Sequence, residues 1–150
     1  MFMFDNKKIK NNIELNITEC AENKNWSKIS LSITDFLKKN NLNNKNITEI
    51  LIVCEEIFVN ICKYSYINLN YIGDVNINIK YNFNDLEIKF VDSGVKFDPT
   101  LVCTPDINKS AKDRKIGGLG LYIVKKIVDN IQYKFIDNKN ILILNKKINN

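Results

Sequence analysis

Histidine is absent from the 150-residue sequence, and proline (2) and glycine (5) are scarce. Without histidine, no Ser-His or Cys-His nucleophile can form. The chain also offers no histidine ligand for zinc and no phosphoacceptor histidine. The 4 cysteines contain no CxxC pair, so a zinc knuckle or a thioredoxin-type motif is not expected. We predict free thiols, because Cys54 and Cys62 fall inside one apolar helical pattern.

Long apolar runs are missing as well. No window reaches the roughly 18 uninterrupted apolar residues that a membrane span needs, and the N-terminal MFMFDNKKIK turns polar too early for a signal peptide. The net charge is +5, but the lysines are scattered among asparagines and isoleucines instead of forming a dense basic run. We therefore expect a cytoplasmic protein without membrane association or direct nucleic-acid binding.

Hydrophobic residues make up 45% of the chain, enough for the core of a single domain over residues 1–150. Successive hairpins favour an α/β (α+β) two-layer sandwich, with a mixed, mostly antiparallel sheet and three helices on one face. Asn46 or Thr48 is the expected N-cap of the second helix. The hydrophobic period predicts strands at 12–19, 75–82, 86–91, 131–136 and 140–147, helices at 24–39, 47–64 and 119–130, and a long loop at 93–117.

The first chemical pattern lies on the second predicted helix, where Glu56 and Asn60 are four residues apart and share a face. With Glu49 and Lys63 they form a polar stripe, whose ordinary explanation is a solvated helix surface. The rest of this helix is apolar almost all round, which favours a stripe that lines a cleft. An amide oxygen suits Mg²⁺, and a carboxylate one turn away can accept a proton from an attacking hydroxyl or water.

Two further patterns follow strands or begin helices. The DSG sequence at 92–94 ends a strand, where an aspartate can accept a hydrogen bond from an exocyclic amine and a glycine lets a flat ring approach. An ordinary turn has the same sequence. The GGLG sequence at 117–120 opens a predicted helix, where free N–H groups and the helix dipole attract anions. A hinge or helix cap is the alternative, and neither a Walker A loop nor the GxGxxG spacing is present.

Taken in order, CEEIFVNICKYSY, VDSGVKFDP and KIGGLGLYIVKKIVDNIQY resemble the N box, the next box and the glycine box of the GHKL ATPases. The pattern D-x-G-x-x-F-D-P followed by GGLGL is similar to the anti-sigma regulatory factors with serine-protein kinase activity. The resemblance covers nearly the whole chain and implies the Bergerat-type ATP-binding fold. Two positions depart from it: Tyr64 stands where many relatives carry histidine, and Ser65 replaces a small alanine or glycine. The histidine-kinase branch does not fit, because it needs a phosphoacceptor histidine.

The resemblance implies that the chain binds ATP with Mg²⁺ and closes a lid, about 95–117, over the nucleotide. Glu56 would be the general base, Asn60 the Mg²⁺ ligand, and Asp92 the partner of the adenine amine. Arg114 or Lys115 would steady phosphate charge, although both could equally serve the solubility of the lid. The other implied nucleotide contacts are Lys63, Gly94 beside the ring, Phe97 at the start of the lid, and Gly117, Gly118, Leu119, Gly120 and Leu121 in the glycine box.

The function that the resemblance implies is an anti-sigma-factor-like serine-protein kinase. Such a protein phosphorylates a serine of a STAS-domain anti-anti-sigma factor, holds a sigma factor inactive, and forms a homodimer. The alternative is an ATP-binding regulatory module that sequesters a protein partner without kinase activity. A plain ATPase, with water in place of the serine, is a third reading of the same residues.

Overall fold

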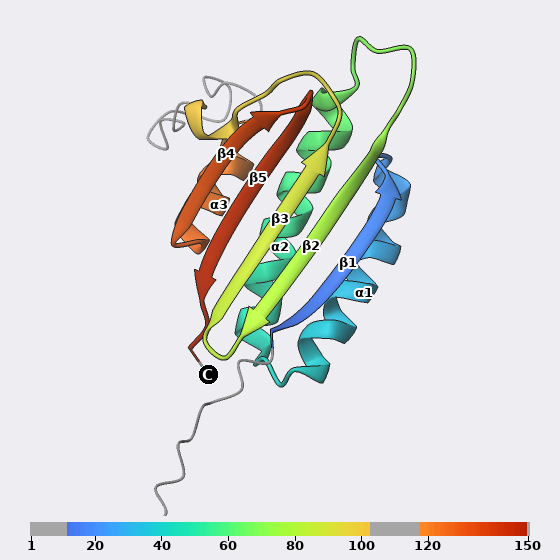
Figure 1. Ribbon diagram of the computed structural model, residues 1–150. Helices are drawn as coiled ribbons and strands as arrows, with labels where there is room; N and C mark the ends of the chain where they lie inside the picture. The colour runs from blue at the N-terminus through green and yellow to red at the C-terminus, as the bar shows by residue number, and fades with distance from the viewer. Residues whose placement is uncertain (1–11, 103–117, 150) are drawn as a thin grey trace, which may run out of the picture.

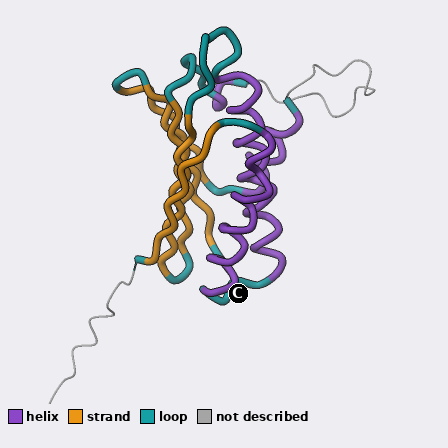
Figure 2. Tube along the Cα trace, turned by 90° about the vertical axis from the view of Figure 1, so that its right-hand side faces the viewer, coloured by secondary structure: helices purple, strands orange, loops and turns teal. Residues whose placement is uncertain are grey.

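The computed structural model describes residues 12–102 and 118–149, which form two layers (Figures 1 and 2). In this part of the chain, a five-stranded sheet has the order β1-β2-β3-β5-β4, and every strand pair is antiparallel. Helices cover one face of the sheet (Figure 2), as predicted. The elements are β1 (Ile13–Cys20), α1 (Trp26–Lys39), α2 (Asn44–Asn60), β2 (Asp74–Asn82), β3 (Asp85–Asp92), α3 (Leu119–Ile127), β4 (Asn130–Ile136) and β5 (Lys139–Lys147).

Two tight hairpins set the register of the sheet. The loop between β2 and β3 has two residues, and Phe83 there has a φ of 54°. The loop between β4 and β5 consists of Asp137 and Asn138, with φ values of 53° and 57°. Turns with left-handed residues match the twist of the strands that they join, and Asp and Asn tolerate this conformation well. The resulting register places Asp92, the last residue of β3, opposite Asn140 of β5.

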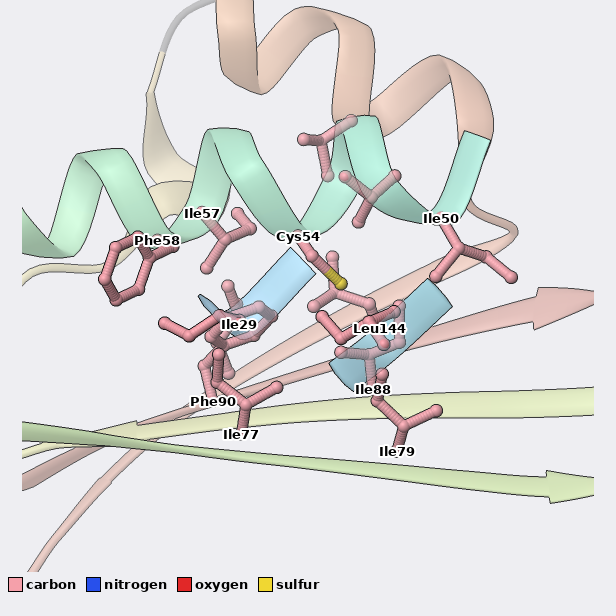
Figure 3. Close-up of a cluster of buried hydrophobic side chains, with 14 of the residues drawn as sticks. Ile29, Ile50, Cys54, Ile57, Phe58, Ile77, Ile79, Ile88, Phe90 and Leu144 are labelled. Atoms are coloured by element: carbon pink, nitrogen blue, oxygen red, sulfur yellow. The ribbon is translucent and has the colours of Figure 1, made fainter. Parts of the chain in front are cut away.

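The core lies between α2 and the sheet, as Figure 3 shows. Along α2, Ile50, Cys54 and Ile57 point toward the strands, and on β2 the alternating Ile77 and Ile79 are fully buried. Burying one such aliphatic side chain contributes roughly 1.5–3 kcal/mol. Burial also raises the pKa of the Cys54 thiol to about 12, so this cysteine is an inert core residue.

The predicted free thiols are confirmed where they can be seen. Cys20, Cys54 and Cys62 are free, whereas Cys103 lies outside the described residues. Within residues 12–102 and 118–149, no helix is long and apolar enough to cross a membrane.

The start of α2 differs from the prediction. Asn43 is the N-cap, and its Oδ1 accepts a hydrogen bond from the backbone N–H of Asn46 at 2.8 Å. The expected caps, Asn46 and Thr48, both lie inside the helix. Several asparagines in succession can each act as a cap, but the side chain of Asn46 is engaged elsewhere, since its Nδ2 donates to the carbonyl oxygen of Asn149 at 3.1 Å.

The helix ends were also misplaced. Regular α-helix stops at Asn60, and Ile61–Ser65 forms a wider π-helical turn, where the sequence predicted a regular helix to residue 64. The third helix is shorter than predicted: α3 ends at Ile127 instead of residue 130, because Val128 already has extended backbone angles. Such π-helical turns change the direction in which later side chains point, and they are frequent at functional sites.

Candidate functional site

A pocket opens beside the C-terminal part of α2. Its wall takes Asn60 from α2, Asp92 and Phe97 from the second chemical pattern, and Leu121 from α3. The three sequence patterns therefore meet at one place. A mostly apolar wall with a few polar groups is typical of a small-molecule site. The other lining residues are Ile57, Ile61, Ser65, Phe90, Pro99, Tyr133, Asn140 and Leu142.

Asp92 supplies a buried carboxylate to this wall and is only 5% exposed. Its Oδ1 accepts two hydrogen bonds, from the backbone N–H of Gly94 at 2.9 Å and from Nδ2 of Asn140 at 3.0 Å. No hydrogen bond with another described residue uses Oδ2. An ionised carboxylate oxygen can only accept, so Oδ2 suits a donor such as an exocyclic amine.

Asn140 holds this carboxylate in place and was not predicted as a site residue. Its Nδ2 donates to Oδ1 of Asp92 and to the carbonyl oxygen of Val95 at 2.9 Å. Its Oδ1 accepts from the backbone N–H of Phe97 at 3.1 Å and from the hydroxyl of Tyr133 at 2.6 Å. An asparagine side chain has two donor hydrogens and two lone pairs, so its capacity is fully used. Asn140 thus joins the end of β3 to the segment 95–97.

Tyr133 completes that network from β4. Burial raises the pKa of Tyr133, so the hydroxyl stays protonated and remains a donor to Asn140 over a wide pH range. Neither residue carries a local motif, and only the register of β3, β5 and β4 brings them to Asp92.

Gly94 permits a close contact between this turn and the π-helical turn. A Cβ atom at Gly94 would lie 2.2 Å from the carbonyl oxygen of Ser65 and 2.4 Å from its Cβ, so no larger residue fits. The neighbouring N–H of Val95 donates to the same carbonyl at 2.7 Å, and the hydroxyl of Tyr66 accepts from the N–H of Ser93 at 3.1 Å. The sequence predicts that Gly94 lets a flat ring of a ligand approach the backbone. Its packing against Ser65 is a further reason for a glycine at this position.

Glu56 lies one turn before Asn60, beside the pocket and not among the residues that line it. A Cβ atom on Gly120 of α3 would be 2.0 Å from Oε2 of Glu56. The Glu56 carboxylate therefore rests against the backbone of the first turn of α3. Among the described residues, no hydrogen bond or ion pair engages this carboxylate.

Asn60 has a buried side-chain nitrogen, Nδ2, that lacks a hydrogen-bond partner within the described residues. Leaving such a group unpaired costs about 1–3 kcal/mol, and it often marks the place of a bound group. Nδ2 can only donate, so it suits a phosphate oxygen, whereas Oδ1, which accepts no hydrogen bond from a described residue, is the atom that can bind a cation. The Asn60 amide therefore fits a Mg²⁺–nucleotide, because Mg²⁺ takes few protein oxygens and keeps phosphate oxygens and waters.

Other members of the predicted polar stripe lie elsewhere. Lys63 is exposed and does not line the pocket; its Nζ lies 5.2 Å from the centre of the Tyr64 ring. The π-helical turn rotates Lys63 away from the face of Asn60. At the other end of the stripe, Glu49 forms an ion pair with Lys146 at 2.9 Å.

The glycine-rich pattern is described in part. Gly118 is the N-cap of α3, Leu119 is partly exposed, and Leu121 lines the pocket. Arg114, Lys115 and Gly117 lie outside the described residues, as does most of the predicted lid. The first residues of the lid pattern are visible, and Phe97 stacks on Tyr64 with ring centres 6.2 Å apart.

Comparison with known proteins places the chain in a family. The sequence profile of the histidine kinase-like ATPase domain matches residues 20–146. No curated protein matches the chain in sequence. One solved structure with the same fold is the crystal structure of the RsbU and RsbW domains of Rv1364c from Mycobacterium tuberculosis, with a TM-score of 0.65 and 12% identity. The alignment covers 91% of this chain but only 32% of that chain, so the present chain spans about a third of its length.

Proposed function

The chain belongs to the histidine kinase-like ATPase domain family, and on that premise we propose that it is an ATP- and Mg²⁺-dependent serine-protein kinase. One observation carries the proposal: Asn60, Asp92 and Leu121, from three separate parts of the chain, line one pocket, while Gly120 packs on Glu56. The sites for the adenine base, the metal and the phosphates of one nucleotide would therefore be adjacent. The family supports ATP binding; the serine specificity and the metal are part of the proposal.

Asp92 and the apolar wall would hold the base. Oδ2 of Asp92 would accept a hydrogen bond from the adenine amine, and Gly94 and Phe97 would lie beside the ring. Asn60 would be the protein ligand of Mg²⁺, which would neutralise the negative charge that develops on the phosphates. At the start of α3, backbone N–H groups of Gly118 and Gly120 would bind phosphate oxygens.

Glu56 would act as the general base. Its carboxylate lies against the first turn of α3, next to the proposed phosphate site. There it would accept the proton of a serine hydroxyl while the serine oxygen forms a bond to the terminal phosphorus and ADP leaves. No described residue engages the carboxylate, so it is not committed to a structural ion pair.

The remaining parts of the proposal rest on the family resemblance alone. They are a single domain over residues 1–150 with a lid at about 95–117, a STAS-type antagonist protein as substrate, a sigma factor as the second partner, a homodimer, and a cytoplasmic location. Further nucleotide contacts would come from Lys63, Arg114, Lys115, Gly117, Leu119 and Leu121.

The test uses radiolabelled ATP and a purified STAS-domain protein. We expect phosphate transfer to a serine, and Glu56→Ala should slow it by about 10²–10⁴-fold, the usual contribution of a general base. ATP binding by the variant, measured by titration calorimetry, should stay largely intact. Transfer by Glu56→Ala at the wild-type rate would show that Glu56 is not the base.

A second candidate is a regulatory module in which ATP only orders the protein for binding a partner. Its support is the position of Glu56 beside the pocket and not within its lining. In the same assay, ATP binding with partner capture but without phosphoprotein would favour this module. Release of inorganic phosphate without any protein substrate would instead indicate a plain ATPase.

A further inference from the structure

Ser65 carries a hydroxyl that faces no hydrogen-bonding partner in residues 12–102 and 118–149. The residue is only 5% exposed and lines the pocket together with Asp92 and Asn140. Among the described residues, its hydroxyl forms no hydrogen bond. The hydroxyl is not one of the described polar atoms that are fully buried without a partner, so it reaches the open space of the pocket, where a ligand can bind it.

The rest of Ser65 is held firmly, which limits where the hydroxyl can go. The carbonyl oxygen of Ser65 accepts from the N–H of Val95 at 2.7 Å, and the Cβ of Ser65 faces Gly94 so closely that a Cβ there would be 2.4 Å away. The π-helical turn Ile61–Ser65 brings the residue to the turn that carries Asp92. Ser65 and Asp92 are thereby fixed to one another through Gly94 and Val95.

The polar groups left for a ligand on this wall are few. Asn140 has all four hydrogen-bonding positions occupied, and Oδ1 of Asp92 already accepts two bonds. What remains on this part of the wall is Oδ2 of Asp92 and the hydroxyl oxygen of Tyr133, which can only accept, and the hydroxyl of Ser65, which can donate. Adenine presents the matching pair, because a donor amine at position 6 is flanked by the ring acceptors N1 and N7.

We propose that Ser65 is a base-recognition residue whose hydroxyl donates to the ring nitrogen, N1 or N7, beside the amine bound by Asp92. This inference rests on the proposed ATP site. It gives a role to a residue that departs from the small alanine or glycine of similar sequences, and it makes the recognition of the base a contact of two side chains.

The experiment is a binding cycle with Ser65→Ala. Dissociation constants for ATP, 1-deaza-ATP and 7-deaza-ATP are measured by titration calorimetry on the full chain and on the variant. Loss of one hydrogen bond should weaken ATP binding about three- to tenfold. One of the two analogues lacks the ring nitrogen to which Ser65 donates. The wild type and Ser65→Ala should bind that analogue with equal affinity. Ser93→Ala is the matched control, because Ser93 is an exposed serine outside the pocket lining, and it should bind ATP as wild type does.

The outcomes separate this inference from the proposed function. Wild-type affinity of Ser65→Ala for ATP would overturn the role of Ser65 and leave the ATP site standing, provided that Asp92→Ala binds poorly. An equal loss with ATP and both analogues would also overturn it, as would a clear fall in the unfolding midpoint of the ligand-free variant, since the hydroxyl would then be structural. Absence of ATP binding by the wild type would remove the proposed function itself, and this inference with it.

Discussion

The two ends of the pocket are built differently. At the sheet end, Asp92 and Asn140 are each 5% exposed, and five hydrogen bonds to side chains and backbone fix them. At the helix end, Nδ2 of Asn60 is buried without a partner among the described residues, and no described residue engages the Glu56 carboxylate. At the sheet end, hydrogen bonds within the protein hold the side chains in place and leave Oδ2 of Asp92 open. At the helix end, no hydrogen bond from a described residue holds the Nδ2 group of Asn60 or the carboxylate of Glu56.

Under the proposed function, this difference would separate recognition of the base from phosphate transfer. A carboxylate that is already oriented loses little freedom when a ligand arrives, so the rigid end can select a base at low entropic cost. Groups that are to meet a cation or a reacting proton must not be satisfied by the protein, because their partners arrive with the ligand. The comparison predicts that substitutions at the sheet end change stability, whereas those at the helix end change ligand-dependent properties.

The largest effect on the ligand-free protein is expected for Asn140→Ala. It removes partners from Asp92, Val95, Phe97 and Tyr133 together, and we expect the free energy of unfolding to fall by about 2–3 kcal/mol. Chemical denaturation followed by circular dichroism measures this loss.

Asn145→Ala is the matched control, because Asn145 lies on the same strand and its side chain has no hydrogen bond to a described residue. The control should change stability by less than about 0.5 kcal/mol. Equal losses for the two variants would contradict the view that the sheet end is held by Asn140.

A smaller and ligand-dependent effect is expected for Asn60→Ala. Without ligand the variant should be as stable as wild type or slightly more stable, because an unpaired buried amide is removed. ATP at a hundred times its dissociation constant should stabilise the wild type by about 2.7 kcal/mol. Thermal unfolding with ATP, with and without Mg²⁺, should show that the variant has lost most of the metal-dependent part. A full response to Mg²⁺ would rule out Asn60 as the metal ligand.

The smallest effect on stability is expected for Glu56→Gln. Since no described residue engages the carboxylate, its neutral isostere should change the free energy of unfolding by less than about 0.5 kcal/mol. The matched variant Glu49→Gln breaks an ion pair with Lys146 that is only partly exposed, and it should cost up to about 1 kcal/mol. Urea denaturation compares the two, and a larger loss for Glu56→Gln would show that this carboxylate has a structural partner.

Much of the fold follows from local patterns. The alternation of Val75, Ile77 and Ile79 predicts β2 because successive side chains of a strand point to opposite faces, and all three are buried. The same argument fails at helix ends. The run of asparagines before α2 offers several equivalent caps, and local sequence does not reveal that the side chain of Asn46 bonds to Asn149 at the far end of the chain while Asn43 caps the helix.

The site was predictable where a residue belongs to a motif and hidden where it depends on pairing. Asp92, Phe97 and Leu121 were chosen from their motifs and do line the pocket. Asn140 and Tyr133 were missed, because a strand residue becomes the neighbour of Asp92 only through the register of β3, β5 and β4. Lys63 was chosen from its spacing to Asn60 on a regular helix, but it lies in the π-helical turn and does not line the pocket. Its contact with the nucleotide stays a prediction.

The π-helical turn has a consequence for how this protein can vary. Up to Asn60 the angular phase of α2 is set by the core, whereas the following residues point in directions offset from that phase. Ser65, the last residue of this turn, lines the pocket, whereas Tyr64 stacks on Phe97 outside the lining. Because Ser65 also packs against Gly94, only a small side chain fits there, and a change between small residues would alter the ligand-facing wall and leave the core between α2 and the sheet as it is.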